Sequence, residues 1–539
     1  MKKIDIYTRK LLLIFSLMAI LFTVSCDEDL LTEVPKSFLS PENTYTDAAG
    51  FDAGLIALYR DGRGFIAPGQ PLLVEKEYEV LYGQGVDIGW HINKSPFISD
   101  YSSLNSFDGT VLRYWQQCYY MIRDANVIIT RAEDEDVAWD SETEKNEIVA
   151  QARFFRAFAY RILVWFYGGV PIIREEITAP KLDFVRDTED DVLAFILEDL
   201  EFASQNLTAD NPNGAKLSKA AADYLLAETY IATQQWDAAL DAADRILDDT
   251  QYALMTARFG TYSSEPGDAY WDLFRLGNQD RTSGNTENIL AWQAQYNVDG
   301  GTGPATGRAW GPFLEKLKTP DNMQAILKDE YLGRPVTFIR ITPWVETGMW
   351  DDFDNDMRNS EYNVQRHFLI NNPASAFYGD TIEPTPGNYV RYMFPYYKKF
   401  THYGAHPQGY DKWGKLYNDW YVFRVAGVYL LKAEAYLGQN DQTNAAAQIN
   451  VLRTRAHASQ VAPADVDIDY ILDERCRELL GEEHRRITLR RTGKLVERTI
   501  LHNPESGTTI QSFNNLLPIP QSEIDANTEA ELTQNPGYN

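Results

Sequence analysis

The sequence predicts a mainly α-helical protein, in which tetratricopeptide-like helical pairs form a scaffold with long irregular loops and small β-hairpins. Apolar residues recur three and four positions apart through most of the chain after Leu30, as in amphipathic helices. Two distant segments repeat each other as a helix, a polar turn and an Ala-rich helix. Between these copies, residues 251–419 lose the helical period and are rich in Gly, Pro, Asn and Asp, which predicts loops with short strands.

Three segments in the first half of the chain show the helical pattern clearly. Val111–Ala132 and Glu147–Phe166 have the apolar spacing of a helix, and the second ends before Gly168 and Pro171. Thr188–Leu207 begins with a threonine cap and has acids in its first turn, where the helix dipole favours them. We expect three long helices here.

The repeated segments are Leu225–Leu247 and Leu431–Arg453, and both contain an Ala-Glu-X-Tyr core. Small residues in each second helix let the two helices approach closely. This is the helix-turn-helix unit of tetratricopeptide repeats, whose period is about 34 residues. Such units cannot bury their faces alone, so we expect the two copies to stack despite the long insertion between them.

The charge of the chain excludes some classes of partner. The net charge is −28, and residues 1–25 hold four basic residues and one acid, so the remainder carries −31. Such a surface repels phosphate backbones, and we expect no nucleic-acid partner. It also repels anionic lipid, so contact with a membrane requires an anchor.

The first 25 residues have the features of a secretory signal peptide. Basic residues precede the apolar run Leu11–Phe22, which is shorter than the ~20 residues that span a bilayer. The residues from Thr23 to Cys26 resemble the lipobox of a bacterial lipoprotein, which implies cleavage before Cys26 and lipidation of this residue. The acids Asp27–Asp29 resemble a signal for export to the cell surface. The alternative is an ordinary cleavage site with an incidental cysteine.

No metal, cofactor or catalytic motif is evident. Cys118 and Cys476 fall in helical patterns, which predicts two buried free thiols, with a bond between them as the alternative. The acids of Asp351–Asp356 are spaced like the start of a calcium loop, but Met357 and Asn363 replace the required Gly and Glu, so we expect a solvated acidic turn. We expect no metal and no cofactor.

A stretch near the C-terminus is rich in acids and arginines, which are residue types that also occur in catalytic sites. The stretch LDERCRELLGEEHRR is interpreted as a charged helix whose ion pairs join residues three and four apart. The sequence has no HExxH, GxSxG or P-loop motif. The sequence does not decide whether two carboxylates form a glycosidase pair, because the distance between them is a three-dimensional property. We expect no catalysis.

Several motifs, in order and over nearly the whole chain, resemble the SusD/RagB family of outer-membrane nutrient-binding lipoproteins. Asp356 and Arg358 match its D-x-R element. The other matching stretches are LTEVPKSFLSPENTYTDAAGFDAGLIALY, ARFFRAFAY with YGGVP, YWDLFRLGNQD, FRVAGVYLLKAEAY, ILDERCRELLGEEHRRITLRRTGKL, LLPIPQSEIDAN and QNPGYN. The resemblance implies a signal peptide over residues 1–25 and a SusD-like domain over 26–539. We divide that domain into a helical part (26–250), a loop-rich insertion (251–419) and C-terminal helices with a closing segment (420–539).

The resemblance also implies a function. Members of the family are held at the outer membrane by a lipid anchor, face the cell surface, bind glycans or in some cases peptides, and pass them to a SusC-like TonB-dependent transporter. We expect a glycan-binding member. The alternatives are a peptide-binding importer subunit, a secreted glycoside-active enzyme, and a helical scaffold that binds only proteins.

A glycan site requires aromatic rings in loops beside planar polar side chains, because the rings cover sugar faces and the polar groups bond hydroxyls. Two regions offer this, the loop Gly83–Phe97 and the insertion. For each tryptophan, packing beneath a loop is the alternative. We expect the double substitution W90A and W310A to abolish glycan binding and leave thermal unfolding nearly unchanged. The candidate residues are Asp87, Trp90, Asn93, Arg308, Trp310, Trp344 and Trp350.

Overall fold

The structure of the protein is a computed structural model. It describes residues 41–538 except 67–72, 74–76, 78, 94–97, 210, 297, 299–300, 302, 329–331, 384 and 402–415. Cys26 and the signal segment 1–25 therefore lie outside the described residues. None of the helices in the described ranges has the length and apolar character needed to cross a membrane.

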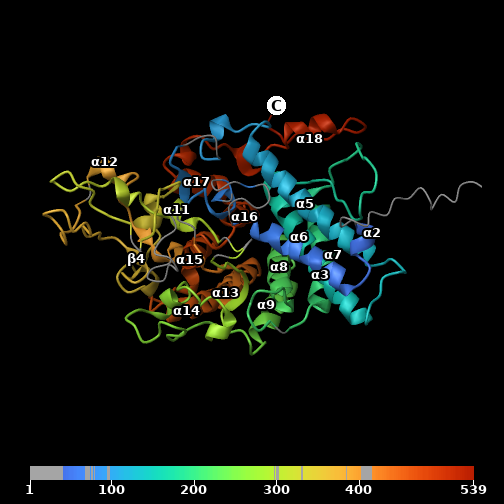
Figure 1. Ribbon diagram of the computed structural model, residues 1–539, viewed down its shortest axis with the longest axis horizontal. Coiled ribbons are helices and arrows are strands. Elements are labelled where there is room, and N and C mark those ends of the chain that lie inside the picture. Colours follow the sequence, from blue (N-terminus) through green and yellow to red (C-terminus); the bar gives the residue numbers. More distant parts are fainter. Residues whose placement is uncertain are drawn as a thin grey trace, which may run out of the picture.

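Helices dominate the fold, as the sequence predicts (Figure 1). Helices α3 and α5 to α7 form the right of the view, and loops of the insertion (yellow to orange) form its left end. The helices of six or more residues are α3 (Ala48–Arg63), α5 (Gly109–Arg131), α6 (Glu142–Tyr167), α7 (Glu189–Asn206), α8 (Lys219–Ala232), α9 (Trp236–Leu247), α13 (Val425–Gly438), α14 (Gln442–Arg455), α15 (Ile468–Leu479), α16 (Arg485–Arg491), α17 (Leu495–His502) and α18 (Gln521–Ala526). The short helices are α2 (Pro41–Thr44), α4 (Glu79–Tyr82), α10 (Ala269–Asp272), α11 (Thr306–Trp310) and α12 (Pro386–Tyr389).

Local capping signals set the ends of the long helices. The Ser141 side chain accepts a hydrogen bond from the Glu144 amide at the start of α6, and Gly168 ends this helix with a φ of +75°, a conformation that favours glycine. Thr188 and Asp191 form a reciprocal capping box at the start of α7. The threonine cap predicted for this helix is confirmed.

The two repeated segments stack as predicted. Helix α13 of the second copy packs against both α8 and α9 of the first copy. The approach is close because small residues lie at the contact. A Cβ atom at Gly427 would lie 2.3 Å from Tyr224 Oη, and a Cβ atom at Gly438 would lie 2.7 Å from the Trp236 ring. A larger side chain at either glycine would force the pairs apart.

Three two-stranded antiparallel pairs complete the described part of the chain. Each pair joins segments far apart in the sequence, so these are not the local hairpins that we expected. Trp90 pairs with Arg340, and Trp292 pairs with Trp420. The strands are β1 (Gly89–His91) with β3 (Ile339–Ile341), β2 (Asn288–Trp292) with β6 (Trp420–Arg424), and β4 (Val364–Gln365) with β5 (Tyr396–Tyr397).

Buried ion pairs connect the insertion to the C-terminal helices. Arg358 Nη2 lies 2.6 Å from Asp356 Oδ2, and Arg358 Nη1 lies 2.8 Å from Glu474 Oε1 on α15. Arg424, at the end of β6, pairs with Glu478 at 2.7 Å. The charged stretch around α15 contains the expected pair three residues apart, Glu474 with Arg477. Most of its charges, however, bond distant segments in the interior, such as Glu478 with Arg424 and Arg485 with Asp87, so the interpretation that its ion pairs join residues three and four apart is wrong for most of them.

The two cysteines in the described ranges are buried free thiols, as the helical pattern predicts. Burial raises the pKa of Cys118 well above its usual value, and burial raises the pKa of Cys476 to about 12. Both thiols are therefore protonated and unreactive at neutral pH.

Candidate functional site

The strand pair β1–β3 brings together the two regions in which the sequence predicts binding residues. Trp90 is only 7% exposed. The Arg340 guanidinium lies 5.7 Å from the Trp90 ring, 5.4 Å from Tyr389 and 4.4 Å from Phe394. Arg340 is itself paired with Glu346. The Trp90 ring thus packs in a buried cation–π cluster.

Asp87 has a structural role in the interior. Its carboxylate is fully buried, with Oδ2 2.6 Å from Arg485 Nη2 and 3.0 Å from Arg498 Nε. Burial alone would raise the pKa of Asp87, but the two arginines outweigh it and lower the pKa to about 2. The ionised side chain therefore connects the loop before β1 to α16 and α17.

The tryptophans of the insertion also pack against other segments. Trp310 is 2% exposed, stacks on Phe400 at 5.2 Å and donates its indole N–H to Glu79. Trp350 is buried, and half-buried Trp344 stacks on His502 at 4.3 Å. Burial of Trp90 and Trp310 contradicts the expectation that their removal leaves thermal unfolding unchanged, because each deletion would open a cavity.

The two polar candidates that remain differ in exposure. Arg308 is half-buried, with its guanidinium 5.3 Å from the Phe338 ring, whereas Asn93 is exposed. The seven candidates therefore do not line one open cavity. Contact between any of them and a ligand stays a prediction.

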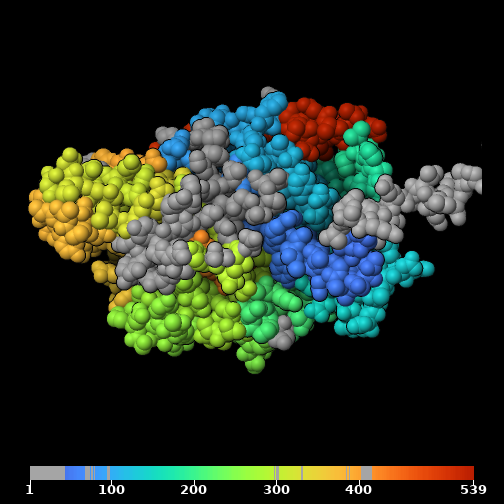
Figure 2. Space-filling model, in the orientation of Figure 1, coloured from blue at the N-terminus to red at the C-terminus, as the bar shows by residue number. Residues whose placement is uncertain are grey.

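An open pocket of about 670 Å³ lies elsewhere, between α3, the residues after β2 and the residue before β6. Figure 2 shows this face, with α3 in blue beside the residues that follow β2 in yellow-green. Its lining includes Tyr59 and Arg60 from α3, Gln293 and Gln295 after β2, and Asp419 before β6. The volume is within the ~300–1,000 Å³ range of small-ligand sites.

Hydrogen bonds fix the walls of this pocket. Asp419 Oδ1 accepts from the Ala294 amide at 2.8 Å, and Arg63 Nη1 donates to the Gln293 carbonyl at 3.1 Å. These bonds hold the chain after β2 between α3 and β6. Trp292 is buried beside Phe155, with ring centroids 6.4 Å apart, so this ring packs in the interior behind the pocket.

The pocket wall includes polar groups that are available to a ligand. The side chains of Gln293 and Gln295 are exposed, and each amide can donate and accept hydrogen bonds. Burial raises the pKa of Asp419 to about 6. No Lys or Arg within the described ranges forms an ion pair with it, whereas Asp87 and Glu474 are each paired with arginines. Ionised Asp419 therefore attracts hydrogen-bond donors.

Sequence reasoning missed Tyr59, Asp419 and the two glutamines. A signal was present, because Gln293 and Gln295 alternate within the strand-like run ENILAWQAQY (Glu287–Tyr296). The partner wall, α3, is more than 200 residues away in the chain, and no local pattern indicates that it faces this run. Within the described ranges, no group of three His, Cys, Asp or Glu side chains could hold a metal ion.

Two family models match the chain. The model described as "SusD family" matches residues 349–538, and the model described as "Starch-binding associating with outer membrane" matches residues 76–231. Together they cover more than half of the sequence.

The chain belongs to the SusD family. SusD-like protein P25 of Formosa agariphila is 25% identical to it, over 96% of this chain and 98% of that protein. The starch-binding protein SusD of Bacteroides thetaiotaomicron is 34% identical over a shorter match, 22% of this chain and 21% of that protein.

Solved structures of SusD-like proteins have the same fold. A laminarin-binding SusD-like protein aligns with a TM-score of 0.69 and 22% identity, covering 92% of this chain and all of that one. Surface glycan-binding protein A of Bacteroides thetaiotaomicron, in complex with laminarihexaose, aligns with a TM-score of 0.69 and 20% identity, covering 91% of this chain and all of that one. The D-x-R residues of this SusD-family chain, Asp356 and Arg358, are fully buried partners. The D-x-R element therefore has a structural role in this chain, because its two charged side chains stabilise the interior.

Proposed function

We propose that this SusD-family protein is a cell-surface lipoprotein that binds oligo- or polysaccharides and delivers them to a SusC-like TonB-dependent outer-membrane transporter. The observation on which this rests is the 670 Å³ pocket, which is lined by exposed glutamine amides and by the carboxylate of Asp419, with which no Lys or Arg of the described ranges forms an ion pair. The relatives support it, since one structural neighbour is a laminarin-binding protein, another is in complex with laminarihexaose, and one relative is a starch-binding protein.

The composition of the pocket suits a sugar. Glutamine amides and a carboxylate can each bond neighbouring hydroxyls, and Arg60 adds further donors. Tyr59 presents an aromatic ring in the same wall, and its hydroxyl is fixed by Gln151 at 2.9 Å and the Leu217 amide at 2.8 Å. A ring held in this way is ordered before a ligand binds, which limits the entropy lost on binding.

Binding without hydrolysis is the activity that we propose. Glycosidases of the common types use two carboxyl groups, about 5–9.5 Å apart, on either side of the scissile bond. Among the described residues that line the pocket, Asp419 is the only acid. This pocket therefore lacks the second carboxyl group in the part that the structure describes, and a glycan would bind there unchanged.

The lipid anchor is part of the same proposal. Acylation of Cys26 would hold the protein at the outer membrane. One of the two matching family models is described as "Starch-binding associating with outer membrane", which supports this location. Several acyl chains give a stable anchor where one gives only weak binding. None of the helices that the structure describes is long and apolar enough to attach the protein by crossing the membrane.

Affinity gels with a panel of polysaccharides, followed by calorimetry on those that bind, test the proposal. We expect the double substitution Q293A and Q295A to weaken binding at least tenfold. The matched control is Q205A, an exposed glutamine on α7, which should leave binding unchanged. Equal loss in both variants, or binding of peptides in place of glycans, would contradict the proposal. Release of reducing ends by the purified protein would show an enzyme instead.

A further inference from the structure

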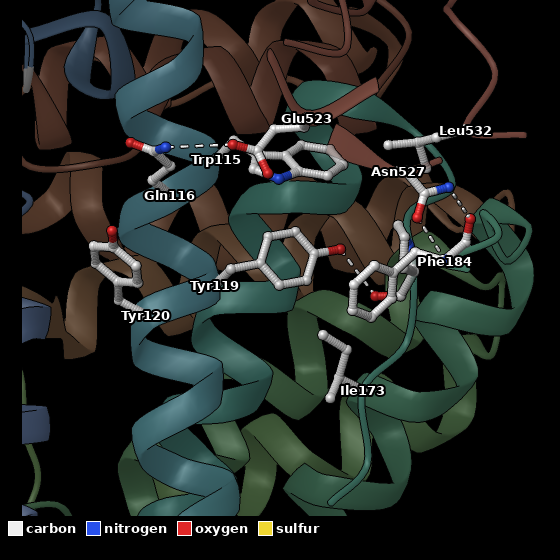
Figure 3. Close-up of a pocket in the computed structure, with 10 residues that line it drawn as sticks. Trp115, Gln116, Tyr119, Tyr120, Ile173, Phe184, Glu523, Asn527 and Leu532 are labelled. Carbon is white, nitrogen blue, oxygen red and sulfur yellow. Dashed lines mark hydrogen bonds between the residues drawn. The ribbon is translucent and has the colours of Figure 1, made fainter. Parts of the chain in front are cut away.

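A second pocket, of about 340 Å³, lies between α5, the segment that follows α6, and the C-terminal segment around α18 (Figure 3). Its walls are mainly aromatic and aliphatic. Trp115 and Tyr119 come from α5, Pro171 and Phe184 from the segment after α6, and Leu532 from the C-terminal segment. The pocket is separate from the proposed glycan site, with which it shares no lining residue.

Two polar side chains of this pocket, Tyr119 and Asn527, hold its walls together. Tyr119 Oη donates to the Pro171 carbonyl at 2.9 Å. Asn527 Oδ1 accepts from the Phe184 amide at 2.7 Å, and Asn527 Nδ2 donates to the Phe184 and Ala530 carbonyls, each at 2.8 Å. The walls are therefore formed before any ligand arrives.

Glu523 is the one acid among the described residues that line this pocket. Its carboxylate is half-buried, and Gln116 Nε2, at 3.3 Å, is its one hydrogen-bond donor among the described residues. Burial raises the pKa of Glu523. Other buried acids near the helical scaffold have arginine partners, such as Glu228 with Arg161 and Asp199 with Arg156. Within the described ranges, no Lys or Arg forms an ion pair with Glu523.

We propose that this pocket binds a cation, an ammonium or guanidinium group on a short apolar stem, with Glu523 as its counter-ion. The rings of Trp115, Tyr119 and Phe184 would enclose the stem, and the faces of aromatic rings attract cations. The Phe184 ring already has a cation near it, since Lys181 Nζ lies 5.5 Å from its centroid. Lys181 is paired with Asp183 at 2.6 Å, so it does not neutralise Glu523.

Ligand-observed NMR on the full mature chain tests the proposal with n-butylamine and n-butylguanidine. The neutral probe n-butanol has the same stem. We expect both cations to bind at least tenfold more tightly than n-butanol, and E523Q to abolish this difference. The control E529Q changes an exposed glutamate of the same C-terminal segment and should retain it. Equal binding of the three probes, an unaffected E523Q variant, or no binding of either cation would overturn the proposal.

Two sources could supply such a cation, a free small amine or a lysine or arginine side chain of another protein. Blocked tetrapeptides with one internal lysine or arginine among glycines distinguish them. Tighter binding of these peptides than of n-butylamine supports a protein side chain, and exclusion of the peptides with retained n-butylamine binding supports a free amine. Thermal unfolding of E523Q should occur at a temperature no lower than that of the unsubstituted protein, since the substitution removes a carboxylate whose burial raises its pKa and which has no cationic partner within the described ranges. A lower unfolding temperature would indicate a structural role and overturn the proposal.

Discussion

Asp87 and Arg485 form a bidentate ion pair in the interior, with Oδ2 2.6 Å from Nη2 and Oδ1 3.1 Å from Nε, although 398 residues separate them in the chain. D87N would leave Arg485 and Arg498 buried without their shared counter-ion. We expect a loss of about 3–5 kcal/mol in the free energy of unfolding, measured by chemical denaturation. The exposed carboxylate of Asp241 provides a control, and D241N should change this free energy little.

The same ion pair predicts acid sensitivity. The pKa of Asp87 in the folded protein is about 2, below its usual 3.8. The stabilising contribution is therefore complete above about pH 4 and is lost as the pH falls toward 2. We expect the unfolding free energy of the unsubstituted protein to decrease more steeply over this window than that of D87N. Parallel pH profiles of the two proteins would contradict the assignment.

Asp419 predicts the opposite pH dependence. Its folded pKa is about 6, above its usual 3.8, so the folded state binds a proton more tightly than the unfolded state. Its contribution therefore becomes less favourable as the pH rises from about 4 to 6. We expect D419N to be more stable than the unsubstituted protein at pH 7, by at most about 3 kcal/mol, and to bind glycans more weakly. If D419N is more stable but binds glycans with unchanged affinity, Asp419 does not contribute to glycan binding.

Trp310 predicts a large effect on stability. Its buried ring packs on Phe400 and its indole N–H bonds Glu79, so W310A would both open a cavity and remove a hydrogen bond. We expect a loss of about 3–5 kcal/mol, measured by denaturant unfolding. The half-buried Trp344 should give a smaller loss in W344A. An unchanged unfolding transition in W310A would mean that the ring is not packed as described.

Membrane attachment is tested at Cys26. We expect C26A to move from the membrane fraction to the soluble fraction in cells that lack the transporter, because an unacylated chain has no anchor. The matched control, C118A, changes a buried thiol and should remain with the membrane. Membrane retention of C26A would show that another feature attaches the protein.

The sequence predicted those parts of the fold that depend on local signals. The spacing of apolar residues placed α5 and α6, the threonine cap placed the start of α7, and the repeated Ala-Glu-X-Tyr core predicted that α13 would stack on the first helical pair. The first two signals lie within a few turns of one helix, and the third is a similarity between two segments about 200 residues apart.

The sequence indicates which kinds of side chain a glycan site needs, but it does not indicate which of those side chains are exposed. Whether a ring in a loop is exposed depends on the segments that cover it. For Trp90 these include β3, about 250 residues later in the chain. Gly- and Pro-rich surroundings suggested exposed aromatics, but the covering segments buried most of them. The arginines of α15 and α16 likewise have partners that no helical spacing indicates, such as Asp87 for Arg485.

The pairing of Trp292 with Trp420 has a consequence for how this protein can diversify. The segment between these two tryptophans therefore begins and ends at neighbouring positions, and between its ends β3 and Arg358 attach it to β1 and to α15. The entropy of closing such a loop depends weakly on its length, about 0.6 kcal/mol for each doubling. Insertions and deletions in the exposed stretches between these attachments can therefore accumulate while the helical framework keeps its shape.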